Sequence, residues 1–212
     1  MTAIDAGADL DASHVAWDLE PLVHGDGRLG VEALLDEADA LADTLAQNRG
    51  QVELFDADEL DRFMQHLADL HELLGLAGSY TSLRFAVDTA DPEVAALMQR
   101  VHERSTDIST RLLFFELEWA ALTDDHAEHL LDHPHLQWCA HHLRSVRKYR
   151  DHMLSEAEER ILTEKSQTGR AAWSRLFSEL SSAITVEVPA TAPDSGTTTV
   201  KLEGALALLA DP

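Results

Sequence analysis

Cysteine is nearly absent from the chain, because Cys139 is the only one among 212 residues. A lone cysteine excludes an intrachain disulfide and every zinc site of the Cys-x-x-Cys type. Long apolar runs are absent as well: none reaches the length of a membrane-spanning helix, and the N-terminal residues carry no basic segment followed by an apolar one. We therefore expect a cytoplasmic protein that makes no contact with a membrane.

Basic residues are scarce, since 16 Lys and Arg stand against 39 Asp and Glu and give a formal net charge of −23. Binding to DNA, RNA or an anionic membrane requires clustered cations that neutralise phosphate groups. The composition therefore excludes nucleic acid as a partner. A hydrophobic share of 45% nevertheless indicates a globular chain with a sizeable core.

Several catalytic motifs are also missing. The sequence has no Gly-rich phosphate loop and no G-x-S-x-G nucleophile elbow. The nearest approach to the zinc motif HExxH is HLADLHELLG at residues 66–75, where the pair His71 and Glu72 is followed by Leu-Leu-Gly. His66 precedes His71 by five residues, so the two imidazoles are well separated around a helix. We predict that this near match binds no zinc.

Helical periodicity is what the sequence does have. Apolar residues recur every three or four positions over residues 28–48, 58–87 and 92–122, which is the pattern of amphipathic helices. An acidic residue at 56 or 58 can cap the second helix, and an Asp-Pro step at 91–92 can open the third. The short break between these two helices predicts an antiparallel hairpin. Shorter helices are expected over residues 124–132 and 134–150.

A further helix is predicted to begin at Ser155, whose spacing to Glu158 forms a capping box. After Ala183 the pattern changes to alternation, and the segments ITVEV and TTTVKL on either side of PATAPDSG predict a β-hairpin. The segment EGALALLADP then begins another helix, so the chain looks cut.

The predicted fold is therefore all-α, an antiparallel bundle of long helices with a small β-hairpin near the C-terminus. We divide it into a loose acidic leader at residues 1–15, a helical region at 16–182, and the hairpin with the start of a further helix at 183–212.

Histidines gather in the segment DDHAEHLLDHPHLQWCAHH. His126, His129 and His133 fall at i, i+3 and i+7, so one helix face could present three imidazoles to a metal ion. A polar helix face is the alternative that we favour, because Pro134 breaks the register and no spacing matches a standard zinc site. Cys139 is expected to be a small buried residue. The remaining histidines of the segment are His135, His141 and His142.

One basic patch, RSVRKYR, could bind a small anion or a substrate carboxylate. Cations near a helix C-terminus that answer the acidic helix after Ser155 explain it equally simply, and we favour that structural role. The cations of the patch are Arg144, Arg147, Lys148 and Arg150.

Aromatic residues at helical spacing offer a second candidate surface. Tyr80, Arg84 and Phe85 lie late in the helix expected to end near residue 87, and they could face a cleft. Aromatic residues in such positions are more often part of a core. We therefore expect a core role for these residues, and the same for Trp119, Trp138 and Trp173.

The order of these signals resembles one family. The segments are AWDLEPL near the start, LRFAVDTADPEVAALMQ, LLFFELEW, and HLQWCAHHLRSVRKYRDHMLSEAEERILTEKSQTGRAAWSRLFSEL, followed by the β-hairpin. They resemble the N-terminal region of oligoendopeptidase F-type zinc peptidases, relatives of thimet oligopeptidase, over about residues 15 to 212. The most specific parts are the H-x-L-S-E-x-E-E step from His152 to Glu159 and the T-G-x-x-x-W step at Thr168, Gly169 and Trp173.

This resemblance implies a large, mostly helical enzyme that cleaves short peptides in a channel. The family holds one zinc through HExxH and a later glutamate, all in the C-terminal half, and this chain has none of those residues. No catalytic, cofactor-binding or metal residue is therefore assigned here. Zinc belongs to the complete family member, and the chain is expected to form one wall of the channel, with short peptides and a C-terminal catalytic region as its partners.

Two other functions remain open. The chain could be a stand-alone helical module that binds peptides or regulates another protein, because it contains no complete reactive constellation. It could also be a helical metal protein that uses the histidine cluster.

Overall fold

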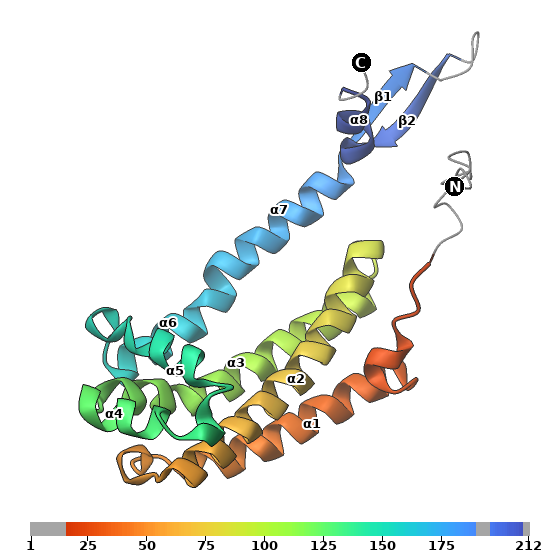
Figure 1. The fold of residues 1–212 in the computed structure, drawn as a ribbon. Coiled ribbons are helices and arrows are strands. Elements are labelled where there is room, and N and C mark those ends of the chain that lie inside the picture. The colour runs from red at the N-terminus through yellow and green to blue at the C-terminus, as the bar shows by residue number, and fades with distance from the viewer. Residues whose placement is uncertain (1–15, 190–195, 210–212) are drawn as a thin grey trace, which may run out of the picture.

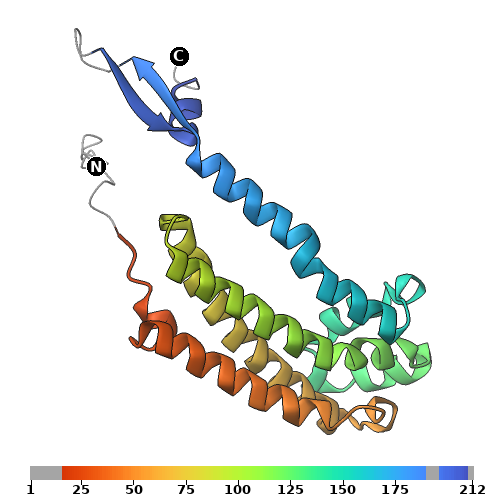
Figure 2. The same cartoon turned by 180° about the vertical axis from the view of Figure 1, so that it is seen from behind.

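The computed structural model describes residues 16–189 and 196–209. The expected leader at residues 1–15 lies outside the described residues. Three long helices, α1 (Gly27–Ala46), α2 (Ala57–Val87) and α3 (Pro92–Ala121), lie side by side in an antiparallel bundle (Figures 1 and 2). The all-α fold, the long-helix hairpin and the positions of these helices are confirmed.

Local hydrogen bonds fix the N-terminal ends of α2 and α3. The Asp56 carboxylate accepts from the backbone N–H of Glu59 at 2.8 Å, and the Glu59 carboxylate accepts from the backbone N–H of Asp56 at 3.0 Å. Asp91 caps α3 by accepting from the backbone N–H groups of Glu93 and Val94. These caps satisfy backbone donors that a helix leaves without partners, so the two helices begin where the sequence predicts.

Aromatic packing joins α2 to α3 in the larger of two hydrophobic clusters. The Phe63 ring stacks on Phe115 with centroids 4.4 Å apart and meets the edge of Phe114 at 6.5 Å. Trp119 is fully buried in the same cluster. A second cluster, formed mainly by α1 and α2, lies toward the other end of the bundle. The bundle is therefore held along its whole length by apolar contacts.

Short elements follow the bundle at the end where α3 finishes. They are α4 (Asp124–Leu131), the 3-10 turn η4 (Pro134–Leu136), α5 (Ala140–Arg147) and the 3-10 turn η5 (Arg150–His152). The single helix expected over residues 134–150 is wrong. The break has a tertiary cause: the Gln137 side chain donates to the carbonyl of Leu131, and the Trp138 indole N–H donates to Asp61 on α2.

The helix expected from Ser155 is present but divided. It consists of α6 (Glu156–Ser166), a π turn (Gln167–Ala171) and α7 (Ala172–Ala183). The capping box is confirmed, since the Glu158 carboxylate accepts from both the backbone N–H and the hydroxyl of Ser155. The division falls at Gly169, whose φ of −98° and ψ of −110° are not helical.

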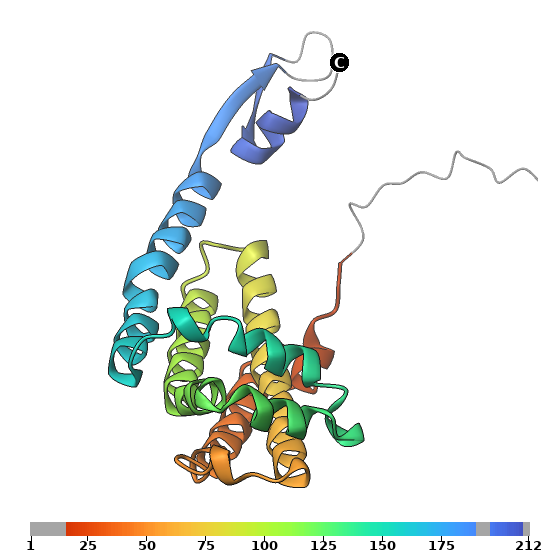
Figure 3. The ribbon, with the colours of Figure 1, turned by 60° about the vertical axis from the view of Figure 1, so that its left-hand side comes forward.

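The arm formed by α6, the π turn and α7 lies beside the bundle, and polar side chains connect the π turn and α7 to it. The Gln167 amide donates to the Thr106 hydroxyl at 2.6 Å, and the Arg175 guanidinium donates to the Gln99 side chain at 2.5 Å. Farther along, the Ser182 hydroxyl bonds Thr89 at 3.1 Å. None of the described residues of α6, α7 or the elements that follow is buried. Figure 3 shows this arm standing beside the bundle.

The predicted β-hairpin is confirmed. Strand β1 (Thr185–Pro189) pairs antiparallel with β2 (Thr197–Lys201), with Val186 opposite Val200. The short helix α8 (Leu202–Leu208) follows. Among the residues that the structure describes, no helix combines the length and the apolar character needed to cross a membrane.

Substitution of two helical glycines by alanine should change stability in opposite directions. A Cβ on Gly30 would lie 2.1 Å from the carbonyl oxygen of Val23, whereas a Cβ on Gly75 would meet nothing within 4 Å. Gly30→Ala should therefore lower the free energy of unfolding by about 1–3 kcal/mol through overpacking. Gly75→Ala should raise it by up to about 1 kcal/mol, because alanine favours the helix. Chemical denaturation measures both, and changes of the same sign would contradict the packing described for α1.

Acidification should weaken the attachment of α7. Partial burial and the nearby Arg175 guanidinium lower the pKa of His102 below its ordinary value of 6.5. The unfolded chain then binds the proton more tightly, so the free energy of unfolding falls as the pH drops through 6.5 and levels off below the pKa in the folded state. His102→Asn should show a smaller fall in denaturation experiments on either side of pH 6.5. Identical pH profiles for the variant and the original chain would refute this role of His102.

Candidate functional site

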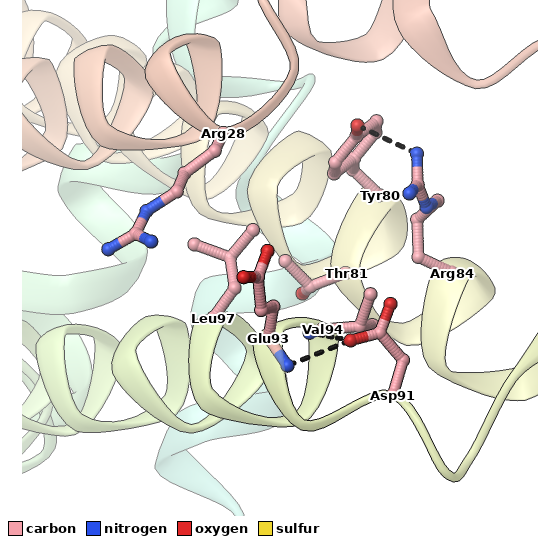
Figure 4. Close-up of a pocket in the computed structure, with 8 residues that line it drawn as sticks. All are labelled: Arg28, Tyr80, Thr81, Arg84, Asp91, Glu93, Val94 and Leu97. Atoms are coloured by element: carbon pink, nitrogen blue, oxygen red, sulfur yellow. Dashed lines mark hydrogen bonds between the residues drawn. The ribbon is translucent and has the colours of Figure 1, made fainter.

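A small pocket opens where the start of α1 meets the end of α2 and the start of α3. Its volume is about 130 Å³, well below the roughly 300–1,000 Å³ typical of sites for small molecules and cofactors. A pocket of this size fits a side chain or a chain terminus. Its lining residues, drawn in Figure 4, are Arg28, Tyr80, Thr81, Arg84, Asp91, Glu93, Val94 and Leu97.

Hydrogen bonds fix the pocket wall that α2 provides. The Tyr80 hydroxyl donates to Glu20 at 2.8 Å and accepts from the Arg84 guanidinium at 3.3 Å. The second carboxylate oxygen of Glu20 accepts from the backbone N–H of Gly27 at 3.0 Å. Burial and the hydrogen bond to Glu20 raise the pKa of Tyr80, so its phenol remains neutral. The wall is thus a fixed polar surface that offers the Arg84 cation.

The opposite wall belongs to α3 and is acidic. Asp91 is occupied by the helix cap that it forms with the backbone of Glu93 and Val94, as the dashed lines in Figure 4 show. The Glu93 carboxylate lies on the pocket side, across from Arg28 (Figure 4). Both signs of charge therefore line one small opening. Such a lining suits binding, and among the pocket residues there is no nucleophile paired with a general base.

Of the three late residues of α2 that were expected in the core, Tyr80 and Phe85 are buried and Arg84 is exposed. Tyr80 and Arg84 also line the pocket, whereas Phe85 does not. Of the tryptophans expected in the core, Trp119 is fully buried, with its indole N–H donating to the carbonyl of Leu143. Core placement is wrong for Trp138 and Trp173, which are 54% and 70% exposed.

The histidine cluster does not form the helix face that its spacing allows. Helix α4 ends at Leu131, and His133 lies beyond it as the residue before Pro134, so it leaves the face of His126 and His129. The structure brings His133 and His135 together with Asp58 of α2 instead. Sequence reasoning missed this group because Asp58 lies far away along the chain.

The remaining metal and nucleophile candidates have structural explanations. Cys139 is buried, and burial together with the negative charge of Asp61 raises its thiol pKa to about 11. The thiol is therefore protonated near neutral pH and is a poor nucleophile or ligand. His66 and His71 both lie on α2, and neither joins a group of possible metal ligands in the described part of the chain. The described residues do not fit a catalytic zinc site of the HExxH type.

The basic patch serves the fold. Arg147 donates to the carbonyl oxygens of Trp119 and Leu122 at 2.7 Å each, which caps the C-terminal end of α3. It also pairs with Asp124, whose pKa is lowered by the hydrogen bonds from Arg147 and Arg150. The structural role is thus confirmed, but the partners are different: they lie on α4 and α3 rather than on the acidic helix after Ser155. Arg144 likewise pairs with Glu128 of α4, and Lys148 is exposed.

The most unusual surface is an apolar row on α7. Trp173, Phe177 and Leu180, here called the α7 stripe, are 70%, 73% and 60% exposed. Their spacing places them on one helix face. Arg175 bonds Gln99 of α3, and Ser182 bonds Thr89 in the loop before α3. Each is two positions from a member of the stripe and so lies on the opposite face. The helix therefore presents its polar side to the bundle and its apolar side to the exterior.

Known proteins share this architecture. A family model described as oligopeptidase F matches residues 118–185. The crystal structure of oligoendopeptidase-F from Enterococcus faecium superposes with a TM-score of 0.68 at 19% sequence identity, covering 81% of this chain and 33% of that one. A protein from Chlamydophila abortus described as a peptidase gives a TM-score of 0.54 at 22% identity, with coverage of 93% and 33%.

The search of curated proteins finds no match. The chain spans about a third of the length of the solved structures that it matches. The segment matched by the family model contains Ser155, Gly169 and Trp173. The resemblance to the N-terminal region of oligoendopeptidase F is therefore confirmed, in fold over most of the chain and in sequence over residues 118–185.

Proposed function

We propose that this chain is the N-terminal, non-catalytic part of a zinc-dependent oligoendopeptidase that hydrolyses short peptides in a channel. In this proposal the helical region at residues 16–182 forms one wall of the channel. The hairpin and helix start at residues 183–212 lead toward a C-terminal catalytic region. The lone cysteine favours the reducing environment of the cytoplasm for the whole enzyme.

The α7 stripe is the observation that carries this proposal. Burying a large apolar side chain contributes about 1.5–3 kcal/mol, so a row of three left in water forfeits a large stabilisation. A contiguous apolar row on an otherwise acidic chain is typical of a surface that packs against more polypeptide. The matched part makes up only 33% of each solved structure that shares this fold, which supports a further region of the protein as the cover.

The pocket beside Tyr80 and Arg84 is the candidate contact for substrate. A short peptide carries a carboxylate at one end and an ammonium group at the other, and the pocket offers Arg84 and Glu93 on opposite walls. The catalytic zinc, supplied by residues outside this chain, would polarise the scissile carbonyl and activate water. The role of this chain is to position the peptide and to admit only short, unfolded substrates.

The isolated chain should hydrolyse no peptide, with or without added zinc. The reason is that the described residues assemble no HExxH-type site and no activated nucleophile. The measurement is peptide hydrolysis followed by mass spectrometry, together with the reading frame beyond codon 212. We expect an HExxH motif in that reading frame. Chelator-sensitive cleavage by the isolated chain would refute the proposal, and so would a longer reading frame without the motif.

Phe177→Ala should have different effects in the chain and in the complete protein. In the isolated chain Phe177 is 73% exposed, so the free energy of unfolding should change by less than about 0.5 kcal/mol. In the complete protein Phe177 would be covered, and the substitution should lower the free energy of unfolding by about 3–5 kcal/mol. Leu54→Ala is the matched control, because Leu54 is equally exposed but lies away from α7. An equally small effect of Phe177→Ala in both forms would show that nothing covers the stripe.

A stand-alone helical module that binds peptides or regulates another protein is the alternative. The exposed α7 stripe would then receive a separate partner rather than a covalently attached region. A stop codon directly after codon 212, together with saturable peptide binding by the isolated chain, would favour this alternative. Peptide binding without a stop codon would not, because the channel wall is also expected to contact peptides.

A further inference from the structure

Three metal-ligating side chains meet at the end of the bundle where α2 begins. Asp58 lies in the first turn of α2, His133 precedes the 3-10 turn η4, and His135 lies within that turn. Each offers one ligand atom, and these atoms all lie within 4.8 Å of one another. We propose that Asp58, His133 and His135 form a binding site for a divalent transition-metal ion such as Zn²⁺. The sequence assigns no metal residue and leaves a metal protein based on His126, His129 and His133 as an alternative. The group proposed here instead joins His133 to His135 and Asp58.

The distances suit such an ion. A tetrahedral zinc with bonds of about 2.0–2.1 Å keeps its ligand atoms about 3.3 Å apart. The Nδ1 atom of His135 lies 3.3 Å from Oδ1 of Asp58, which already matches that separation. The third ligand atom has to approach by up to about 1.5 Å. Asp58 and His135 can supply this movement, because their side chains are 66% and 63% exposed.

A ring nitrogen of His133 that lacks a hydrogen-bond partner also supports the proposed metal site. The Nδ1 atom of His133 is buried and has no hydrogen-bond partner among the described residues. A buried ring nitrogen without a partner costs free energy, and a metal ion bound through this nitrogen would remove the cost by accepting its lone pair. The His133 and His135 rings meet edge to face with centroids 4.9 Å apart, so the two imidazoles are already held together.

The surroundings hold the ligands in place without the metal. The Trp138 indole N–H donates to Asp61 at 2.8 Å, which fastens the segment after η4 to α2 one helical turn from Asp58. The capping box of Asp56 and Glu59 fixes the backbone on both sides of Asp58. The ligands are therefore largely positioned by the fold, and a cation is also attracted by the net charge of −23.

The ligand set selects the class of metal. Two imidazoles and one carboxylate suit zinc, nickel, cobalt and copper, whereas magnesium and calcium prefer sites made entirely of oxygen. Water would complete the coordination, because the group provides three protein ligands. A bound ion would join the first turn of α2 to η4, so binding should also raise the melting temperature of the chain.

Calorimetric titration of the untagged 212-residue chain with zinc chloride tests the proposal. We expect one equivalent of Zn²⁺ to bind, with similar stoichiometry for Ni²⁺ and Co²⁺ and no binding of Mg²⁺ or Ca²⁺. Asp58→Asn and His135→Gln should each weaken zinc binding by about tenfold or more, since each removes a ligand. Both residues are exposed, so circular dichroism should show an unchanged fold for either variant.

Matched controls separate this site from the other histidines. His129→Gln and His141→Gln change exposed histidines outside the group and should leave zinc binding unchanged. The proposal is overturned if zinc does not bind, if Asp58→Asn and His135→Gln bind it as tightly as the original chain, or if a control variant alone abolishes binding. In the first of these cases His135 and Asp58 form a simple hydrogen-bonded pair.

Discussion

The arrangement of the elements that follow the long-helix bundle depends on the contacts of Trp119 near the end of α3. The Trp119 ring is fully buried, and its indole N–H donates to the carbonyl of Leu143 in α5 at 2.9 Å. Arg147 lies over the same ring with its guanidinium carbon 5.9 Å from the centroid, and it also binds the carbonyl of Trp119. One aromatic residue is therefore held on two sides by α5. This arrangement fixes α5 against α3, and the position of α5 sets the place from which α6 and α7 leave.

The direction of α7 follows from this junction. It explains why α7 presents its polar face to the bundle and its apolar face to the exterior. Polar bonds from Gln167 and Arg175 attach the arm to α3, and Ser182 bonds Thr89 in the loop before α3. Their net contribution is modest, because each replaces bonds to water. The apolar stripe contributes nothing while it faces solvent. A helix attached in this way is held in direction but is only weakly stabilised by the described chain. It gains its main stabilisation when the stripe is covered, which makes the arm the natural junction between a wall segment and a further region.

Sequence reasoning succeeded where the determinants are local. The caps at Asp56 and Asp91 and the 3.6-residue periodicity fix α2 and α3 almost to the residue, because both signals act within one or two helical turns. The β-hairpin is likewise set by alternation and turn residues. The expected helix at 134–150 failed because the bonds from Gln137 and Trp138 to other elements outweigh local propensity.

The candidate sites required information that no short stretch of sequence contains. The spacing of Trp173 suggested a place in the core, but spacing cannot say what covers a side chain, and core placement was wrong. The approach of Gly30 to Val23 and the meeting of Asp58 with His135 both depend on tertiary packing.

Ion pairs between helices hold many of the arginines of the helical region. Arg104 and Arg111 of α3 share the carboxylate of Asp39 on α1, and Arg100 pairs with Glu32. Arg144 and Arg147 are committed to α4. Arginines held by neighbouring carboxylates are less available to neutralise phosphates. The acidic excess is thus left on the surface, where it repels polyanions and attracts metal cations, and where the apolar α7 stripe stands out as the surface best suited to meet another part of a protein.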